Sequence, residues 1–274
     1  MKKVTIKDLY RNTENYIDKT VEVAGWVRTV RDSKAFGFIE LNDGSFFNNL
    51  RIVFNDKLAN FEEVRKLTIS SSIIVNGKVV KTENAKQPFE IHADSVEIFN
   101  LADADYPLQK KRHSFEYLRT VAHLRPRTNT FNAVFRIRSV AAFAIHEYFQ
   151  NNGYVYVNTP IITCADCEGS AEMFKLTTLD LDKPLPQKDG KTDFSEDLFG
   201  KKAYITGSGQ LHGETFAEAY GKIYTFGPTL RSENSNTKIH ANEFWMIEPE
   251  IAFCDLEQLM DIEEDCLKFV VSRV

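Results

Sequence analysis

Two carboxylates, Glu248 and Glu250, stand in an otherwise apolar and aromatic run near the end of the chain. The surrounding stretch, residues 221–253, has two apolar runs that flank a polar loop, which predicts an antiparallel hairpin. Strand alternation places five of its side chains on one face, namely Arg231, Phe244, Met246, Glu248 and Glu250. Because an unpaired buried charge is very costly, these carboxylates need cationic partners or a ligand. A long surface hairpin with ion pairs is the plainer alternative.

A glycine-rich turn lies upstream of the hairpin, with Ser208 between Gly207 and Gly209. A strand is predicted before the turn at residues 203–206, and a helix is predicted from about Gln210 onward. Such a turn can seat an anion, because the first backbone N–H groups of a helix are unpaired. The glycine spacing differs from that of a P-loop or a dinucleotide-binding fingerprint, so the turn alone identifies no ligand.

The four cysteines favour free thiols over a metal centre or a disulfide framework. Cys164 and Cys167 form a lone CxxC, whereas Cys254 and Cys266 lie far from it in the sequence. A structural zinc site needs a full set of ligands, so we expect no metal site here. Sparse cysteines are typical of a reducing compartment, which predicts a cytoplasmic protein.

The overall composition is that of an ordinary globular protein, with 43% hydrophobic and 27% charged residues among 274. This length suffices for two domains. No apolar run approaches about 18 residues, so the sequence predicts neither a membrane span nor a secretory signal. The net charge of −5 argues against a protein that is basic all over, but it leaves room for a local nucleic-acid surface.

The first hundred residues are predicted to form a small β-domain. Alternating runs at 20–30, 35–41, 50–54, 71–80 and 90–99 predict five strands, with one helix expected at 61–67. This is the inventory of a five-stranded OB-fold β-barrel. Such barrels bind single-stranded nucleic acid on aromatic and basic side chains, and Arg28, Phe38 and Arg51 fit that description. The alternative, that Phe36 and Phe38 fill the barrel interior, stays open.

The remaining elements follow a basic connector at residues 101–128, whose charges are by default a solvated face. The longest helix is predicted at 129–151, with an apolar stripe broad enough for a core or a subunit interface, and a strand follows at 154–158. Residues 161–174 are predicted to be a loop, and 181–198 an insertion without periodicity. A last helix is predicted at 255–274, with a buried face made by Leu256, Leu259, Met260, Leu267, Val270 and Val271.

Taken together, these stretches resemble the class II aminoacyl-tRNA synthetases of the aspartyl, asparaginyl and lysyl subgroup. Residues 135–160 are similar to motif 1, Leu230-Arg231-Ser232-Glu233 to motif 2, and residues 208–214 to the amino-acid pocket. Within the subgroup, residues 206–214 and 223–250 are most similar to the bacterial asparaginyl enzymes. The resemblance implies an α+β fold. An OB-fold anticodon-binding domain is expected at 1–100, a hinge at 101–128, and the N-terminal part of the catalytic domain, an antiparallel sheet flanked by helices, at 129–274.

Motif 3 of the family, a glycine-rich segment that ends in an ATP-binding arginine, has no match before Val274. The resemblance therefore implies an N-terminal piece of a synthetase that is itself inactive. The late acidic residues with which the family binds Mg²⁺ have no match either, so the ion is expected while its ligands are not in the chain. A non-catalytic RNA-binding or regulatory paralogue and an aspartate-using synthetase stay open as alternatives.

The activity implied by the resemblance is ATP-dependent attachment of asparagine to tRNA-Asn through an asparaginyl-adenylate. Asparagine is favoured over aspartate because Gly213 stands where the aspartyl enzymes usually carry a lysine. The implied partners are ATP, asparagine and tRNA-Asn, with a homodimer through residues 135–160 and with neither DNA nor a membrane.

The resemblance also implies site residues, with Arg231 as the clamp for the substrate carboxylate and the α-phosphate. The ATP-binding residues would be Arg231, Glu233, His240 and Phe244. The asparagine-binding residues would be Glu168, Ser208, Gln210, Glu214 and Glu248, the last of which would meet the substrate ammonium. The anticodon-binding residues would be Arg28, Phe38 and Arg51, with Phe38 stacked on the central base. The role of Glu214 stays open, and Glu250 is taken as structural.

Overall fold

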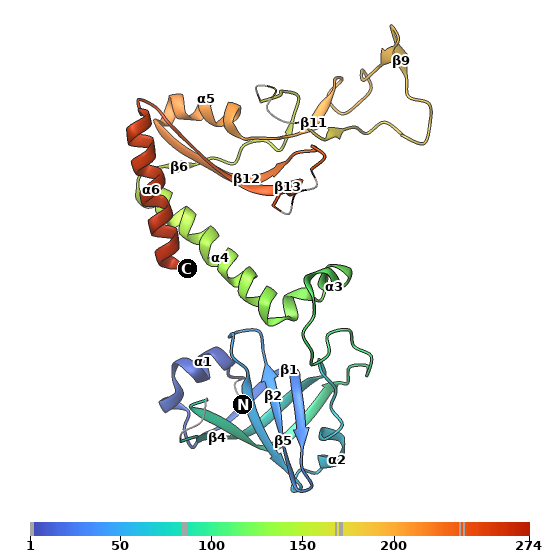
Figure 1. Cartoon of the computed structure of the whole chain (residues 1–274), viewed down its shortest axis with the longest axis vertical. Coiled ribbons are helices and arrows are strands. Elements are labelled where there is room, and N and C mark those ends of the chain that lie inside the picture. Colours follow the sequence, from blue (N-terminus) through green and yellow to red (C-terminus); the bar gives the residue numbers. More distant parts are fainter. Residues whose placement is uncertain (1–2, 84–86, 168, 170–171, 236, 238) are drawn as a thin grey trace. The chain divides into compact units, whose positions relative to one another are not determined.

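The structure is a computed structural model that describes every residue except 1–2, 84–86, 168, 170–171, 236 and 238 (Figure 1). The chain divides into two compact units, Met1–Arg136 and Ile137–Val274. The long helix α4 (Asn129–Asn151) contributes residues to both units. Within the described residues, no helix combines the length and the apolarity needed to cross a membrane.

The first unit contains a closed barrel of five strands in the order β1-β2-β3-β5-β4. These strands are β1 (Thr20–Asp32), β2 (Phe36–Asn42), β3 (Leu50–Asn55), β4 (Ser72–Lys81) and β5 (Phe89–Asn100). Neighbouring strands pair antiparallel except β3 and β5, which pair parallel. Helix α1 (Ile6–Arg11) and the 3-10 turn η1 (Thr13–Asn15) precede the barrel, and α2 (Phe61–Val64) joins β3 to β4. The predicted five-stranded OB-fold barrel is confirmed.

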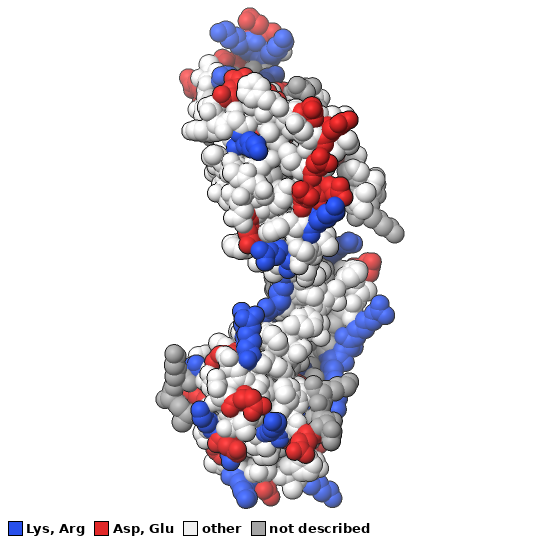
Figure 2. All heavy atoms as spheres, turned by 90° about the vertical axis from the view of Figure 1, so that its left-hand side faces the viewer, with Lys and Arg blue, Asp and Glu red and all other residues white. Residues whose placement is uncertain are grey.

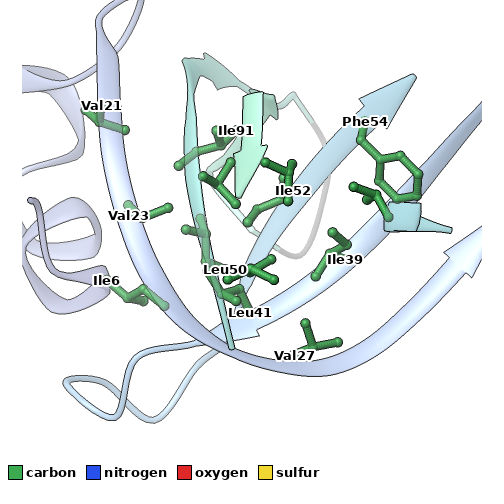
Figure 3. Close-up of a cluster of buried hydrophobic side chains, with 14 of the residues drawn as sticks. Ile6, Val21, Val23, Val27, Ile39, Leu41, Leu50, Ile52, Phe54 and Ile91 are labelled. Atoms are coloured by element: carbon green, nitrogen blue, oxygen red, sulfur yellow. The ribbon is translucent and has the colours of Figure 1, made fainter. Parts of the chain in front are cut away.

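The barrel interior is filled by side chains that alternate along the strands (Figure 3). The fully buried side chains of this core include Val23, Val27, Ile39, Leu41, Leu50, Ile52, Phe54 and Ile91. Gly37 is required beside them, because a Cβ at that position would come within 2.3 Å of the Phe54 ring. The same alternation turns Phe38 outward, and neither Phe36 nor Phe38 belongs to the core cluster. The alternative in which these two rings fill the barrel is therefore wrong.

The connector after the barrel has a small core of its own. Helix α3 (Phe115–Thr120) begins at Ser114, whose hydroxyl accepts a hydrogen bond from the Tyr117 N–H at 3.2 Å. The 3-10 turn η2 (Arg125–Arg127) then leads into α4. The side chains that pack together here are Leu108, Leu118 and Leu124, with Tyr106, Val121 and Phe131 against them. The sequence predicted only a basic connector in this region and missed the buried cluster.

The second unit contains two small three-stranded sheets. One has the order β13-β12-β6, made by β6 (Val155–Tyr156), β12 (Lys222–Leu230) and β13 (Glu243–Ile251). The other has the order β7-β11-β8, made by β7 (Ile162–Thr163), β8 (Lys175–Leu176) and β11 (Ala203–Ile205). Strands β12 and β13 form the predicted hairpin, and α5 (Gln210–Tyr220) contacts both of them. Pro249 is tolerated because β13 lies at the edge of its sheet.

Short strands occur in two segments where the sequence predicted none. Strand β7 falls within the predicted loop at 161–174, because its backbone pairs with β11, which is distant in the sequence. Strands β9 (Gln187–Lys188) and β10 (Lys191–Thr192) form a hairpin inside the insertion. The turn between them is Asp189-Gly190, with φ angles of 52° and 75°. An Asp-Gly pair by itself favours a tight β-hairpin turn, so this hairpin could have been predicted from the sequence.

Helix α6 (Leu256–Arg273) turns inward only part of the face that the sequence predicted. Four of the six side chains predicted to be buried are more than half exposed, namely Leu256 (70%), Met260 (53%), Leu267 (67%) and Val271 (74%). Val270, one of the predicted six, packs together with Cys266 and Phe269 against a cluster that includes Tyr148 and Phe149 of α4. One residue rotates a helix by about 100°, so a weakly amphipathic pattern leaves the inward face ambiguous by one position. The contact with α4 selects which face of α6 is turned inward.

Candidate functional site

A carboxylate pocket lies where β13, β12 and the start of α5 meet. The Glu248 carboxylate accepts hydrogen bonds from the Thr225 hydroxyl at 2.7 Å, from the Gly209 N–H at 3.1 Å and from the Ser208 hydroxyl. Gly209 is the N-cap of α5, so the carboxylate sits at the positive end of that helix. A Cβ at Gly209 would come within 2.7 Å of Thr159 Oγ1, and the close approach therefore requires glycine. These donors explain how an apolar strand carries an acid without a paired cation.

Two more carboxylates extend this pocket into what we term the acidic wall, composed of Glu214, Glu248 and Glu250. Gln210 Nε2 donates to Glu214 Oε1 at 3.1 Å on the first turns of α5. Glu250 faces Gly213, where a Cβ would lie 3.5 Å from the Glu250 Cγ atom. Burial, followed by the charges of Glu214 and Glu248, raises the pKa of Glu250. Among the described residues, no Lys, Arg or His forms an ion pair with any carboxylate of the acidic wall.

Arg231 lies just after β12, beside an aromatic ring. Its Nε donates to the Gly207 carbonyl at 3.2 Å, and its guanidinium carbon lies 5.5 Å from the centre of the Phe244 ring. Its Nη2 also lies 3.6 Å from Met246 Sδ. These three side chains share a face, as the strand alternation predicts. A planar cation over an aromatic ring can bind an anion and leave a surface on which a flat ligand stacks.

The turn that follows Arg231 is tied to the segment before β8. Ser232 donates to the Glu172 carbonyl from its N–H at 2.7 Å and from its hydroxyl at 3.0 Å. The Glu172 N–H in turn donates to Glu233 Oε1 at 3.2 Å. Asn242 Nδ2 donates to the Arg231 carbonyl at 2.8 Å. Neither Glu172 nor Asn242 was expected at the site from the sequence, since Glu172 binds through its backbone atoms and Asn242 binds a backbone carbonyl through its side-chain amide.

His240, an expected ATP-binding residue, makes a local contact in the hairpin loop. His240 is exposed, and its Nδ1 pairs with the hydroxyl of Thr237 inside the hairpin loop. Glu168 lies outside the described residues. Within the described ranges, no three His, Cys, Asp or Glu side chains are arranged to hold a metal ion.

Thr225 is a site residue that the sequence analysis missed. It lies directly opposite Glu248 in the register of β12 and β13, and it is 3% exposed. Its hydroxyl is one of the donors to that carboxylate. The signal available in the sequence was a polar residue at an inward-facing position of a largely apolar strand.

A separate cluster lies on the outer face of β2 and β3 in the first unit. Phe38 is half-exposed, and the Arg51 guanidinium carbon lies 5.9 Å from its ring centre. Phe36 meets Phe38 edge-on, with 5.5 Å between the ring centres. Arg51 Nε also contacts Glu40 Oε1 at 3.4 Å. An exposed aromatic ring beside a cation is a surface on which a nucleic-acid base can stack.

Arg28 is not brought into this cluster. The pairing of β1 with β2 shifts between Val27 and Thr29, which makes Arg28 the extra residue of a β-bulge. Its guanidinium donates to the Arg127 carbonyl at 2.6 Å and to Asn129 Oδ1 at 3.2 Å. Phe38 and Arg51 therefore lie together on the outer face of β2 and β3. The bulge directs Arg28 toward the connector instead.

Comparison with known proteins assigns families to both regions. Residues 21–99 match the OB-fold nucleic acid binding domain family, and residues 114–274 match the tRNA synthetases class II (D, K and N). The second match covers more than half of the chain. The chain therefore belongs to the class II tRNA synthetases of the D, K and N group, which confirms the resemblance drawn from the sequence motifs.

Its curated relatives include asparagine–tRNA ligases. The chain is 62% identical to the enzyme of Acetivibrio thermocellus over 273 residues, and 60% identical to that of Clostridium tetani over 274. It spans 59% of the length of each. Among solved structures, asparaginyl-tRNA synthetase from Pyrococcus horikoshii complexed with asparaginyl-adenylate superimposes with a TM-score of 0.84 at 27% identity. That match covers 100% of this chain and 58% of the archaeal chain.

Proposed function

We propose that this chain is part of a ligase that attaches asparagine to tRNA-Asn, with ATP consumed to form an asparaginyl-adenylate. Membership of the D, K and N family supports the reaction class. Relatives named asparagine–tRNA ligase, and a solved relative complexed with asparaginyl-adenylate, support the amino acid. Within the chain itself, the single observation that carries the choice of asparagine is the acidic wall.

The acidic wall favours an amide over a carboxylate on electrostatic grounds. Two unit charges 4 Å apart interact by about 4 kcal/mol at an effective dielectric constant of about 20, so Glu214 and Glu250 would repel the side chain of aspartate. The amide of asparagine carries no charge and can donate N–H groups to the same carboxylates. Gly213 leaves this wall without the lysine that would neutralise it. A pocket of this kind discriminates by orders of magnitude, because the wrong ligand leaves polar groups unpaired.

The adenylation step needs positioning and charge neutralisation rather than a side-chain nucleophile. Arg231 would hold the asparagine carboxylate against the α-phosphate, because its planar fork suits both groups. Phe244 would stack on the adenine ring, and Glu233 would accept a hydrogen bond from the adenine amino group. Glu248 would bind the substrate ammonium, and Ser208 would keep that carboxylate in place.

Four other residues belong to the proposed pocket. Gln210 and Glu214 would line the side-chain end of the asparagine site, where they already contact each other. His240 would reach the outer phosphates of ATP after the hairpin loop moves. Glu168, outside the described residues, would act from the loop beside the pocket. Mg²⁺ is expected to accompany ATP and to shield its phosphates, and no ligand for it is assigned within this chain.

For the first unit we propose anticodon recognition by the OB-fold domain at 1–100, joined by the hinge at 101–128 to the catalytic portion at 129–274. Phe38 would stack on the central anticodon base, with Arg51 at its side and Arg28 less directly involved. The match of residues 21–99 to a nucleic acid binding domain supports this role. RNA rather than DNA is the proposed partner, and the cytoplasm is the proposed location.

We further propose a homodimer through residues 135–160. Helix α4 leaves a set of large apolar side chains exposed, namely Val134, Phe135, Ile137, Val140 and Phe143. A twofold interface between two copies of the helix would bury them.

Amino-acid-dependent exchange of labelled pyrophosphate into ATP tests the proposed reaction, measured on the natural protein that contains this sequence. We expect kcat/KM for asparagine to exceed that for aspartate by about 100-fold or more. Equal exchange with the two amino acids would overturn the choice of asparagine. Exchange that neither amino acid supports would overturn the assignment as a ligase of this subgroup.

A further inference from the structure

Thr225 is a buried hydroxyl side chain in the middle of β12. It is 3% exposed, and the strand register places it opposite Glu248 of β13. Its neighbours Tyr224 and Phe226 pack in the cluster with Phe149 of α4, so Thr225 faces away from that cluster. A buried hydroxyl costs free energy unless it is hydrogen-bonded, and valine would occupy much the same space without that cost. The hydrogen bond of Thr225 is therefore the feature that calls for a function.

The partner of this hydroxyl is a carboxylate that water only partly reaches. Thr225 Oγ1 donates to Glu248 Oε2 at 2.7 Å. A hydrogen bond to an ionised carboxylate is shorter and stronger than one between neutral groups. Glu248 is half-buried, whereas water surrounds acidic side chains at the surface such as those coloured red in Figure 2. Protein donors must therefore replace part of the solvation that Glu248 lacks.

The donors to Glu248 come from two separate elements. The Ser208 hydroxyl donates to Oε1, and the Gly209 N–H is shared between Oε1 at 3.3 Å and Oε2 at 3.1 Å. Both residues belong to the turn that begins α5, whereas Thr225 belongs to β12. Thr225 supplies the shorter of the two bonds to Oε2. Without Thr225, this oxygen would keep only the longer, shared bond from Gly209.

Covalent geometry alone does not fix the plane of the Glu248 carboxylate. The terminal torsion of a glutamate side chain is broad, in contrast to the narrow staggered wells of its other torsions. Donors on both oxygens are therefore needed to select one orientation. Ser208 acts on Oε1 and Thr225 acts on Oε2, so the two hydroxyls together define the plane in which the lone pairs of Glu248 lie.

The donors in place leave Glu248 room for about one more hydrogen bond. An ionised carboxylate has about four lone-pair sites. Ser208, Gly209 and Thr225 already donate to this one. The remaining acceptor site suits an N–H group of a ligand, and a primary ammonium supplies such a group with a complementary charge. The direction of that last bond depends on the plane of the carboxylate and therefore on Thr225.

We propose that Thr225 is a positioning residue for the α-ammonium of the amino-acid substrate, and that it acts by holding the Glu248 carboxylate in one plane. This inference rests on the proposed function, in which Glu248 binds that ammonium. Thr225 acts through Glu248 and does not itself contact the substrate. Its effect is confined to the ammonium end of the ligand, because Arg231 is proposed to bind the carboxylate and Glu214 the side-chain amide.

The test compares two analogues of asparagine, each of which lacks one charged group. Asparaginol retains the ammonium and the amide but has no carboxylate, whereas succinamate retains the carboxylate and the amide but has no ammonium. Isothermal titration calorimetry on the natural protein that contains this sequence gives a Kd for each analogue.

The variants separate the hydroxyl from the shape of the side chain. Thr225→Val removes the hydroxyl, and Thr225→Ser and Thr225→Ala form a matched pair that differs only by the hydroxyl. Thr229→Val is the control, because Thr229 is 2% exposed on the same strand. Within the described residues, the Thr229 side chain makes no hydrogen bond to Glu248.

Thr225→Val and Thr225→Ala are expected to bind asparaginol about tenfold more weakly than the original protein, because a hydrogen bond to a charged group is lost. Their affinity for succinamate is expected to stay within about twofold, since this analogue has no ammonium for Glu248 to bind. Thr225→Ser and Thr229→Val are expected to bind both analogues within about twofold of the original. Unchanged asparaginol binding by Thr225→Ala, or an equal loss in Thr225→Ser or Thr229→Val, would overturn the proposal.

Failure of the positioning role and failure of the proposed site give different results. If Thr225→Ala loses affinity for asparaginol and succinamate alike, the hydroxyl supports the pocket as a whole, so the positioning role is wrong while the asparagine site stands. If the unaltered protein binds neither analogue, the asparagine site is wrong and the role of Thr225 falls with it. If Thr225→Val does not fold, as judged by far-UV circular dichroism, the serine and alanine pair decides by the same criteria.

Discussion

Glu250 sits in an environment that favours its protonated form. Burial and the charges of Glu214 and Glu248 raise its pKa above the ordinary value of 4.5. A carboxyl whose pKa is higher in the folded chain than in the unfolded chain lowers the free energy of unfolding as the pH rises from the unfolded to the folded pKa. The sequence predicts a structural role for Glu250. An acid with a raised pKa, however, lowers the stability of the fold at neutral pH. The cost is consistent with a role in selecting the ligand.

Glu250→Gln is accordingly expected to melt at a higher temperature than the original protein at pH 7. Below about pH 4 the two melting temperatures are expected to converge, because the carboxyl is then protonated in both the folded and the unfolded chain. Differential scanning fluorimetry across pH 3.5–8 measures both. Glu218→Gln, on an exposed position of α5, serves as the control and should shift little. A Glu250→Gln variant that is less stable at pH 7 would show that the carboxylate supports the fold.

Phe38 is available for base stacking because it points out of the barrel. Its neighbours Gly37 and Ile39 are buried, and the ring itself is half-exposed beside Arg51. Stacking of a base on an aromatic ring is worth about 1–3 kcal/mol. The ring can therefore be removed without opening a cavity in the barrel core.

Phe38→Ala is expected to weaken binding of a tRNA-Asn transcript by about tenfold, with a nearly unchanged melting temperature for the first unit. Filter binding and thermal melting by circular dichroism give the two values. Ile39→Ala is the contrasting variant, since Ile39 is fully buried and its loss is expected to cost about 2–5 kcal/mol of stability. A large fall in the melting temperature of Phe38→Ala would return this ring to a packing role.

At the scale of elements, α6 shows how a helix face is chosen by its neighbours. Phe269 lies on the inward side, with 5.7 Å between its ring centre and that of Tyr148. Leu267, two positions earlier, is 67% exposed. Both are large and apolar, so composition alone does not separate them.

Phe269→Ala is expected to destabilise the second unit by about 2 kcal/mol, while Leu267→Ala is expected to change stability by less than about 0.5 kcal/mol. Urea unfolding followed by tryptophan fluorescence reports the two values, because Trp245 lies in this unit. The pair is its own control, as each variant removes one large apolar side chain from the same helix. Equal losses would mean that Leu267 also packs against a partner in solution.

At the scale of the whole molecule, helix α4 leaves several large apolar side chains exposed. Phe143 is 71% exposed, and the large apolar side chains Val134, Phe135, Ile137 and Val140 of the same helix are also exposed, whereas Ile145, Tyr148 and Phe149 are buried. A group of exposed apolar side chains marks an interaction site more often than an isolated one does. The proposed twofold interface would bury them in each copy.

Phe143→Glu is expected to shift the protein toward monomer, because it places a charge in the centre of the proposed interface. Sedimentation velocity at micromolar concentration measures the change, and an unaltered far-UV circular dichroism spectrum controls for folding. A natural protein that sediments as a clean monomer before any substitution would contradict the homodimer.

The sequence by itself determined the local elements and their order. Strand alternation predicted the five-stranded barrel and the hairpin at 221–253, and it placed Arg231, Phe244 and Glu248 on one face. These features follow from periodicity, which depends on backbone geometry and on residues close together in the chain. The family motifs were readable for the same reason, since each lies within one short stretch.

Tertiary structure decided which of several locally equivalent arrangements is realised. The bulge that redirects Arg28, the inward face of α6 and the pairing of β7 with β11 all depend on partners distant in the sequence. The acidic wall arose the same way, because the fold brings Glu214 of α5 close to Glu248 and Glu250 of β13. The sequence motifs named Glu214 and Glu248, but charge and burial act through space, so only the folded molecule shows how these two carboxylates meet Glu250.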